Sequence, residues 1–206
     1  MKKLPVKTVK EQIIKACNDY GANPCILLAF ASIETGGTFN NLANNNGTYL
    51  GVFQLSNGYG GVKGNDRYDP YKSCVGAIKG IEELQDTFEK KGLVYYDYYA
   101  YLRHQQGLNG LLSIIKEQNS KIENYSRKKA LINNLPNNVK AIYVKDFLNY
   151  WANRFDSEMQ KCEIKCSVNG LYDQYCSVNY NNETFEITNL NKLQFTTNIG
   201  NRNYYL

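Results

Sequence analysis

The feature that most constrains this chain is an apolar segment that ends in a single carboxylate. Residues 26–33 are apolar apart from Ser32, and Glu34 follows them directly. Asn23 and Pro24 supply a cap and a first-turn proline at the start, and Gly36 follows one residue after the carboxylate. Such residues are typical of helix starts and ends. The sequence therefore predicts a helix that begins near Pro24 and ends just beyond Glu34.

The position of Glu34 predicts an acid that keeps its proton near neutral pH. On a helix, Leu27, Phe30 and Glu34 lie on one face, so the carboxylate is partly desolvated. It also faces the negative end of the helix dipole. Both effects raise the pKa of a carboxyl group, and a protonated carboxyl group is what general acid catalysis requires. The plain alternative is a solvated residue at a helix end, where Lys or Arg would be the better electrostatic choice.

Composition describes a globular chain with mild charge. The chain has 206 residues, enough for one domain with an appendage, and 43% of them are hydrophobic. Its 18 Tyr, together with many Asn, suit a carbohydrate-binding surface, although compositional drift explains them equally well. The net charge of +5 comes from scattered Lys and Arg rather than a basic stripe, which disfavours nucleic acid as a partner.

The remaining sequence reads as helices first and strands last. Thr8 and Glu11 form a capping-box pattern, and Ser73 is a second candidate cap. A loop over residues 38–69 contains residues 50–55 as a short strand or a packed loop. Periodic apolar positions predict six further helices, over residues 8–20, 73–92, 95–106, 111–118, 126–135 and 138–162.

From residue 163 the apolar period changes. Asn169-Gly170 predicts a hairpin, and residues 185–188 and 193–197 predict further strands, with mostly coil as the alternative. We therefore expect an α+β, mainly α protein. Its catalytic domain would cover residues 1–160, and a small β-rich or irregular extension would cover residues 161–206.

The cysteines leave their pairing open. Cys17 and Cys25 flank a predicted turn between two helices and could meet there. The spacing of Cys162, Cys166 and Cys176 lacks the paired pattern of a structural zinc site, and no His lies nearby. Buried free thiols are slightly favoured over disulfides, and we expect neither metal nor cofactor. The six are Cys17, Cys25, Cys74, Cys162, Cys166 and Cys176.

The chain shows neither a signal-peptide pattern nor an apolar run long enough to span a membrane. On these grounds we expect a soluble protein without an export signal of its own.

Three motifs, in order, resemble the soluble lytic transglycosylases of the lysozyme superfamily, and most of all the versions carried by bacteriophage virions. The resemblance covers about residues 8 to 156 and leaves the C-terminal extension uncovered. Asp69-Pro70 also falls where that family has Asp-Pro before its next helix. The motifs are Ala31-Ser32-Ile33-Glu34-Thr35-Gly36-Gly37, Gly51-Val52-Phe53-Gln54-Leu55 and Tyr101-Leu102-Arg103-His104-Gln105-Gln106-Gly107.

The resemblance implies cleavage of the β-1,4 bond between N-acetylmuramic acid and N-acetylglucosamine in peptidoglycan. One Glu, here Glu34, would act as acid and then as base while the muramic 6-hydroxyl closes an anhydro ring. Asp66 and Asp69 remain possible electrostatic partners, which leaves a hydrolytic muramidase open. The partners implied are glycan strands and other virion or tail proteins. The location implied is the virion, or the host cytoplasm before holin-dependent release.

Further site residues follow from the resemblance. Thr35 replaces the family Ser, with a hydroxyl able to bond the carboxylate. Phe53 and Gln54 belong to the second motif, and Gln54 looks towards the cleft or, alternatively, points outward. His104 and Gln105 stand where the family has Tyr and Asn, and are expected to line the cleft, with packing as the alternative for His104. Two tyrosines, Tyr98 and Tyr101, would flank the sugar or pack in the core.

Two rival functions remain. In one, Cys25 or Cys74 pairs with His104 in a hydrolase that cuts peptide crosslinks. In the other, a lysozyme-like scaffold binds the wall or builds the virion without catalysis.

Overall fold

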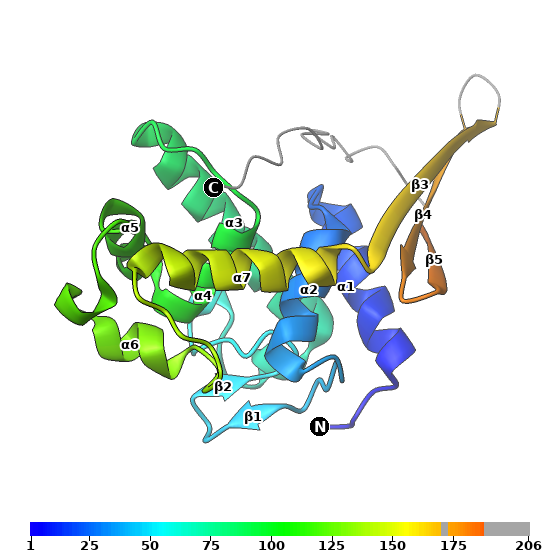
Figure 1. The fold of residues 1–206 in the computed structure, drawn as a ribbon. Helices are drawn as coiled ribbons and strands as arrows, with labels where there is room; N and C mark the ends of the chain where they lie inside the picture. Colours follow the sequence, from blue (N-terminus) through cyan, green and yellow to red (C-terminus); the bar gives the residue numbers. More distant parts are fainter. Residues whose placement is uncertain (170–172, 188–206) are drawn as a thin grey trace.

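The protein is mainly helical, and residues 162–169 and 173–187, which follow the last described helix in the sequence, form a small antiparallel sheet (Figure 1). The computed structural model describes residues 1–169 and 173–187. Among these residues, none of the helices combines the length and the apolar character that a membrane span requires. The α-helices are α1 (Val6–Tyr20), α2 (Pro24–Thr35), α3 (Pro70–Lys90), α4 (Tyr98–Gln106), α5 (Leu108–Lys116), α6 (Lys128–Asn133) and α7 (Val144–Met159).

Short elements fill the long connections between these helices. Strands β1 (Asn44–Asn45) and β2 (Tyr49–Leu50) pair antiparallel, and two 3-10 helices follow them, η1 (Tyr59–Gly61) and η2 (Gly64–Tyr68). A third, η3 (Ile122–Asn124), precedes α6. The predicted loop is therefore a packed segment that contains a very short hairpin.

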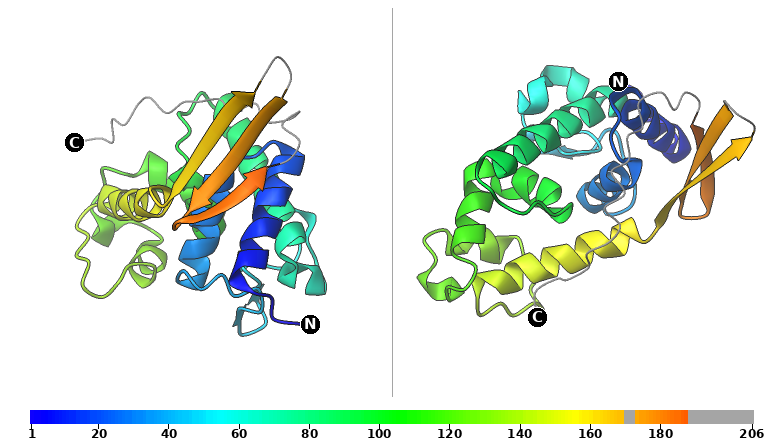
Figure 2. Two further views of the ribbon diagram at one scale, coloured as in Figure 1. Left: turned by 90° about the vertical axis from the view of Figure 1, so that its right-hand side faces the viewer. Right: turned by 90° about the horizontal axis from the view of Figure 1, so that it is seen from above.

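Helix α2 lies at the centre of the molecule. It contacts α1, α3 and α7 and also strands β3 and β4. Seen from above in Figure 2, it lies inside a ring of longer helices. Every residue from Pro24 to Ser32 is buried. An apolar helix of this kind is stable only when it is covered on all sides, and its C-terminal end carries Glu34.

The bounds of α2 agree with its sequence pattern. The side chain of Asn23 accepts a hydrogen bond from the Cys25 N–H at 2.9 Å, and Pro24 is the first helical residue. Gly36 ends the helix with φ +58°, a left-handed conformation that glycine adopts without a steric cost.

The six other predicted helix starts differ from the structure by two to six residues, those of α1, α3 and α7 among them. Helix α1 begins at Val6, so Thr8 lies inside it and caps nothing. Helix α3 begins at Pro70 and is capped by Asp69, whose side chain accepts from the Lys72 N–H at 3.0 Å; Ser73 is buried within it. In both cases a proline a few residues upstream supplies the earlier start.

Helix α7 begins at Val144 rather than near residue 138. The carboxylate of Asp146 accepts hydrogen bonds from the N–H groups of Ile142 and Tyr143, both at 2.8 Å, and this arrangement fixes the start. Ile142, which the periodicity placed on the buried face, is 63% exposed.

The C-terminal sheet has the order β3 (Cys162–Asn169), β4 (Asp173–Tyr180) and β5 (Glu183–Ile187), and all pairs are antiparallel. The predicted hairpin agrees with the antiparallel pairing of β3 and β4, whose register ends with Asn169 opposite Asp173. Gly170 of the predicted turn lies outside the described residues, as do residues 171–172. The strand predicted over residues 193–197 also lies outside them.

The sheet packs on α1 and α2 and shares one hydrophobic core with the helices. Val178 and Tyr180 of β4 are fully buried, and Phe185 of β5 is 5% exposed. The buried Lys10 of α1 pairs with Glu183 of β5 at 2.5 Å. Helices and sheet are therefore held together by apolar burial and by an ion pair.

Two disulfides correct the cysteine predictions. Cys25 is bonded to Cys162 rather than facing Cys17, and Cys166 is bonded to Cys176 across the β3–β4 pair. Free buried thiols, the slightly favoured alternative, are found only at Cys17 and Cys74, whose sulfurs lie 3.9 Å apart. The partner of Cys25 could not be predicted from sequence spacing, because Cys162 is 137 residues away.

Candidate active site

Glu34, in the last turn of α2, is a nearly buried carboxyl group with a strongly shifted pKa. Only 15% of its side chain is exposed. Burial raises its pKa from 4.5 to about 7, because a desolvated carboxylate loses its hydration; a hydrogen bond with Tyr101 partly opposes this shift. At neutral pH the group is therefore divided between its acid and its base form.

Helix α4 supplies the two polar side chains that face Glu34. Tyr101 hydrogen-bonds to the carboxyl group. The Nε2 atom of His104 lies 3.7 Å from Oε1 of Glu34, which is longer than a hydrogen bond. Burial, together with the charge of Arg103, lowers the pKa of His104 to about 4. His104 is therefore neutral around pH 7, and its contact with Glu34 is not an ion pair.

An aromatic group built around Phe30 packs beside this site. The Phe30 ring packs against His104 at 4.9 Å, Phe53 at 5.4 Å and Tyr101 at 5.6 Å between ring centroids. Phe53 is fully buried, which corrects the expectation that it contacts substrate. Its ring packs against Phe30 within the core. Trp151 of α7 covers the other side of Tyr101 at 4.9 Å.

Three residues that the sequence analysis missed complete the surroundings of His104. The Tyr59 ring lies 5.4 Å from the His104 ring, and the Arg103 guanidinium lies over Tyr59 at 4.8 Å. Arg103 also forms an ion pair with Glu83 of α3. Gly80 makes room for this stack, since a Cβ there would lie 2.6 Å from the Tyr59 hydroxyl. Adjacency to His104 could have drawn attention to Arg103, but no local pattern indicates Tyr59 or Glu83.

The second motif forms a tight turn rather than a regular strand. Gly51 has φ +78°, and a Cβ there would lie 1.8 Å from the carbonyl oxygen of Arg67, so only glycine fits. Gln54 also has a positive φ, +46°, and is 9% exposed. Its Nε2 donates to the Gly51 carbonyl at 2.8 Å. The side chain of Gln54 therefore does not point outward, and its amide group has a hydrogen-bond partner.

A cavity of about 390 Å³ lies next to His104. His104 belongs both to its wall and to the surroundings of Glu34, and Gln105 also lines it. Glu34 is not part of the wall, so the acid lies behind His104 as seen from the cavity. The lining residues are Tyr49, Ser56, Tyr59, Arg103, His104, Gln105, Gln106, Gly107 and Leu108.

Two predicted site residues have other surroundings. The Thr35 hydroxyl donates to the Ala31 carbonyl at 2.7 Å and accepts from the Phe39 N–H at 2.9 Å. It serves the end of the helix, which corrects the expected bond to the carboxylate. Tyr98 is buried and packs against Tyr99 at 4.4 Å, in the core arrangement that was the alternative to sugar contact.

The structure thus brings together Glu34, Tyr101 and His104, with Gln105 within hydrogen-bond reach of Tyr101. Among the residues that the structure describes, no group of His, Cys, Asp and Glu is arranged to hold a metal ion. A buried acid of pKa about 7 can both give up and accept a proton near neutral pH, and His104 lies between it and the cavity.

No protein-family model and no curated protein matches this chain.

Proposed function

We propose that the protein cleaves the β-1,4 glycosidic bond between N-acetylmuramic acid and N-acetylglucosamine in peptidoglycan, with Glu34 as general acid and base. The observation that carries the proposal is the buried carboxyl group at the end of α2, whose pKa of about 7 permits both proton transfers near neutral pH. The ordered motifs around Glu34, Gln54 and His104 supply the substrate class by resemblance, and with it a lysozyme-like fold.

In the proposed reaction, protonated Glu34 donates to the glycosidic oxygen as the bond breaks. The ionised carboxylate then accepts the proton of the muramic 6-hydroxyl, which attacks the anomeric carbon and closes an anhydro ring. Tyr101, which hydrogen-bonds to the carboxyl group, stabilises the ionised form between these steps. His104 and Gln105, in the cavity wall, would orient the glycan.

A single-carboxylate mechanism is favoured over the two-carboxylate plan of most glycosidases. The two acidic candidates for a second role are engaged elsewhere. Asp66 pairs with Lys72 at 2.8 Å in an exposed position, and Asp69 caps α3. This supports an anhydro-forming lytic transglycosylase rather than a hydrolytic muramidase.

The structure disfavours a Cys–His peptidase. The Cys25 sulfur is bonded to Cys162 and cannot act as a nucleophile. Cys74 is fully buried beside Cys17, and burial raises the pKa of its thiol, which suppresses the reactive thiolate.

The setting proposed for this activity is local opening of the wall by a bacteriophage, either from the virion or as a lysis enzyme released through a holin. Both settings follow from the resemblance, and the chemistry of Glu34 would be the same in each.

Zymography on purified peptidoglycan tests the proposal. Wild-type protein should give a clearing band, and Glu34→Gln should lose at least a hundredfold in activity because the amide cannot donate its proton as an acid does. Glu11→Gln, which removes an exposed carboxylate from α1, is the matched control and should keep full activity. A band that persists in Glu34→Gln would rule out this assignment.

Mass spectrometry of the digested muropeptides separates the two products. A lytic transglycosylase leaves an anhydro end, whereas a muramidase leaves a reducing end that is heavier by one water. The absence of any wild-type band on walls from several bacteria would instead favour a wall-binding or structural protein.

A further inference from the structure

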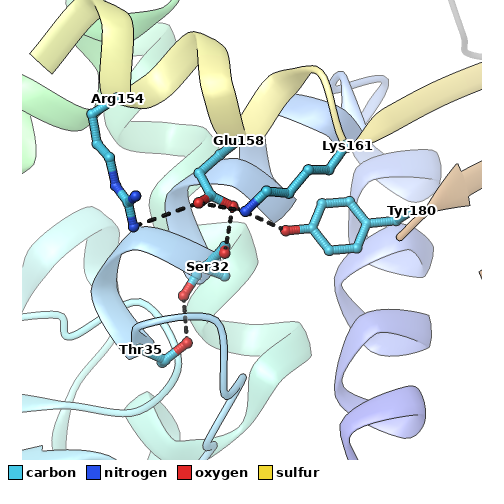
Figure 3. Close-up of polar contacts among 7 residues, drawn as sticks. Ser32, Thr35, Arg154, Glu158, Lys161 and Tyr180 are labelled. Atoms are coloured by element: carbon cyan, nitrogen blue, oxygen red, sulfur yellow. Dashed lines mark hydrogen bonds and ion pairs between the residues drawn. The ribbon is translucent and has the colours of Figure 1, made fainter. Parts of the chain in front are cut away.

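The connection between α7 and the C-terminal sheet touches α2 near both of its ends. We call this segment, Glu158 to Cys162, the α7–β3 junction. Its last residue, Cys162, is disulfide-bonded to Cys25 in the first turn of α2. Its first residue, Glu158, accepts a hydrogen bond at 2.7 Å from the hydroxyl of Ser32, which lies in the last turn of α2 (Figure 3). One short segment therefore holds the central helix at two points.

Glu158 is a buried carboxylate at the centre of a polar cluster. Its side chain is 2% exposed, and Lys161 donates to it at 2.7 Å. Arg154 lies 3.5 Å away one turn earlier on α7, and the hydroxyl of Tyr180 reaches it from β4 at 3.5 Å. Figure 3 shows these groups converging on one carboxylate from α2, α7 and the sheet.

The cluster keeps Glu158 charged. Burial by itself would raise the pKa of Glu158, but hydrogen bonds from Lys161 and Ser32 and the charges of Lys161 and Arg154 outweigh it and lower the pKa. A buried charge that is fully bonded holds its partners in one geometry, because any displacement leaves the charge unpaired. Ser32 is therefore held firmly to α7.

Ser32 and Glu34 lie on opposite sides of the same turn of α2. Two residues correspond to about 200° of rotation and about 3 Å of rise along an α-helix. Ser32 faces Glu158 of α7, whereas Glu34 faces Tyr101 and His104 of α4. Any rotation of the last turn that moves Ser32 must move the acid as well.

We propose that the α7–β3 junction is a positioning clamp for the acid: Glu158, acting through Ser32, holds the last turn of α2 so that Glu34 stays buried between Tyr101 and His104. The Cys25–Cys162 disulfide fixes the opposite end of the same helix, so rotation at one end is not relieved by sliding at the other. Glu158 is a positioning residue and does not touch the reacting groups. The catalytic meaning of the clamp rests on the proposed function, but its effect on Glu34 does not.

Release of the clamp has a measurable signature at Glu34. The titratable groups that face the acid are Tyr101 and His104 of α4, with Tyr59 beyond His104. Burial is the main cause of the raised pKa. A loosened last turn admits water, and the pKa of Glu34 then falls from about 7 towards its ordinary value of 4.5.

The experiment is a titration of the Glu34 carboxyl carbon by NMR in three variants. Ser32→Ala removes the link without changing any charge, and Glu158→Gln removes the buried charge. Glu163→Gln is the matched control, since Glu163 is exposed on β3 and, among the described residues, pairs with the exposed Lys165. We expect the pKa of Glu34 to fall by at least one unit in Ser32→Ala and in Glu158→Gln, and to stay unchanged in Glu163→Gln.

The same shift should appear in catalysis. The basic limb of kcat/KM should move to lower pH by the same amount, with kcat falling about tenfold at pH 7 and KM little changed. Should Glu158→Gln fail to fold, Ser32→Ala decides alone. A folded Ser32→Ala protein in which Glu34 titrates as in wild type overturns the clamp. A shifted titration in a protein without wall-cleaving activity would keep the clamp and reject the proposed function.

Discussion

The Nε2 atom of His104 lies 3.7 Å from Oε1 of Glu34, and burial moves the pKa values of the two groups in opposite directions. The pKa of Glu34 rises to about 7 and that of His104 falls to about 4. Between these values both groups are uncharged in the folded protein. The site therefore holds a neutral pair, because the cost of desolvating two charges exceeds what they would gain by pairing.

Opposite shifts predict opposite effects of pH on stability. Glu34 has an ordinary pKa of 4.5, so the folded state holds an extra proton between pH 4.5 and 7, and stability falls across that window as pH rises. His104 has an ordinary pKa of 6.5, so the unfolded state holds the extra proton between pH 4 and 6.5, and stability rises with pH there. Each effect amounts to about 3 kcal/mol, and the two nearly cancel in wild type.

Single variants should uncover each effect. Glu34→Gln should gain about 3 kcal/mol in free energy of unfolding as pH rises from 4 to 6.5, because only the His104 effect remains. His104→Gln should instead lose a similar amount between pH 4.5 and 7. Urea unfolding at pH 4, 5, 6, 7 and 8 measures both. Parallel stability curves for wild type and the two variants would contradict the opposed shifts.

Tyr101 sets how far the pKa of Glu34 rises. Its hydrogen bond favours the ionised carboxylate and lowers that pKa against the larger effect of burial. Tyr101→Phe keeps the ring and removes the hydroxyl, so the pKa of Glu34 should rise above 7 by about one unit. NMR titration of the carboxyl carbon measures this shift. Tyr125→Phe, which removes a buried hydroxyl bonded to Ser113, is the matched control and should leave the pKa unchanged.

The same pKa values predict the pH dependence of wall cleavage. The first step needs protonated Glu34, so kcat/KM should fall about tenfold per unit above pH 7. Below pH 4, protonation of His104 places a cation beside the acid, favours its ionised form and lowers the rate. Initial rates on suspended cell walls between pH 3 and 9 test this profile. Its basic limb should persist in His104→Gln, whereas its acidic limb should disappear.

The parts of the fold that sequence could predict are those with local causes. The start of α2 depends on Asn23 and Pro24, and its end on Gly36, so neighbouring residues suffice. The other starts were missed because competing local patterns were present. Thr8 and Glu11 fit the sequence pattern of a capping box, but Pro5 allows α1 to begin earlier, and Thr8 then lies inside the helix.

The site was predictable at its centre and not at its edges. The local argument for a raised pKa at Glu34 holds, and burial, one of the two effects it named, is the main cause. Contacts such as Arg103 with Glu83, or Ser32 with Glu158, join residues 20 and 126 positions apart. No spacing rule reaches these pairs, since they depend on how the helices pack.

The two disulfides should differ in their effect on stability because they close loops of different length. Cys25 and Cys162 are 137 residues apart, whereas Cys166 and Cys176 are 10 residues apart. In the chain-entropy description, the longer loop corresponds to about 5 kcal/mol and the shorter to about 3 kcal/mol. Replacing both Cys25 and Cys162 by Ser should therefore lower the free energy of unfolding, measured in urea, by about 2 kcal/mol more than the same change at Cys166 and Cys176.

The variant without Cys25 and Cys162 also frees the start of α2 and should lower the pKa of Glu34. The variant without Cys166 and Cys176 leaves α2 untouched and serves as its control. Equal losses in the two variants would mean that the long-range bond does not restrain the unfolded chain, and that α2 is held by its packing alone.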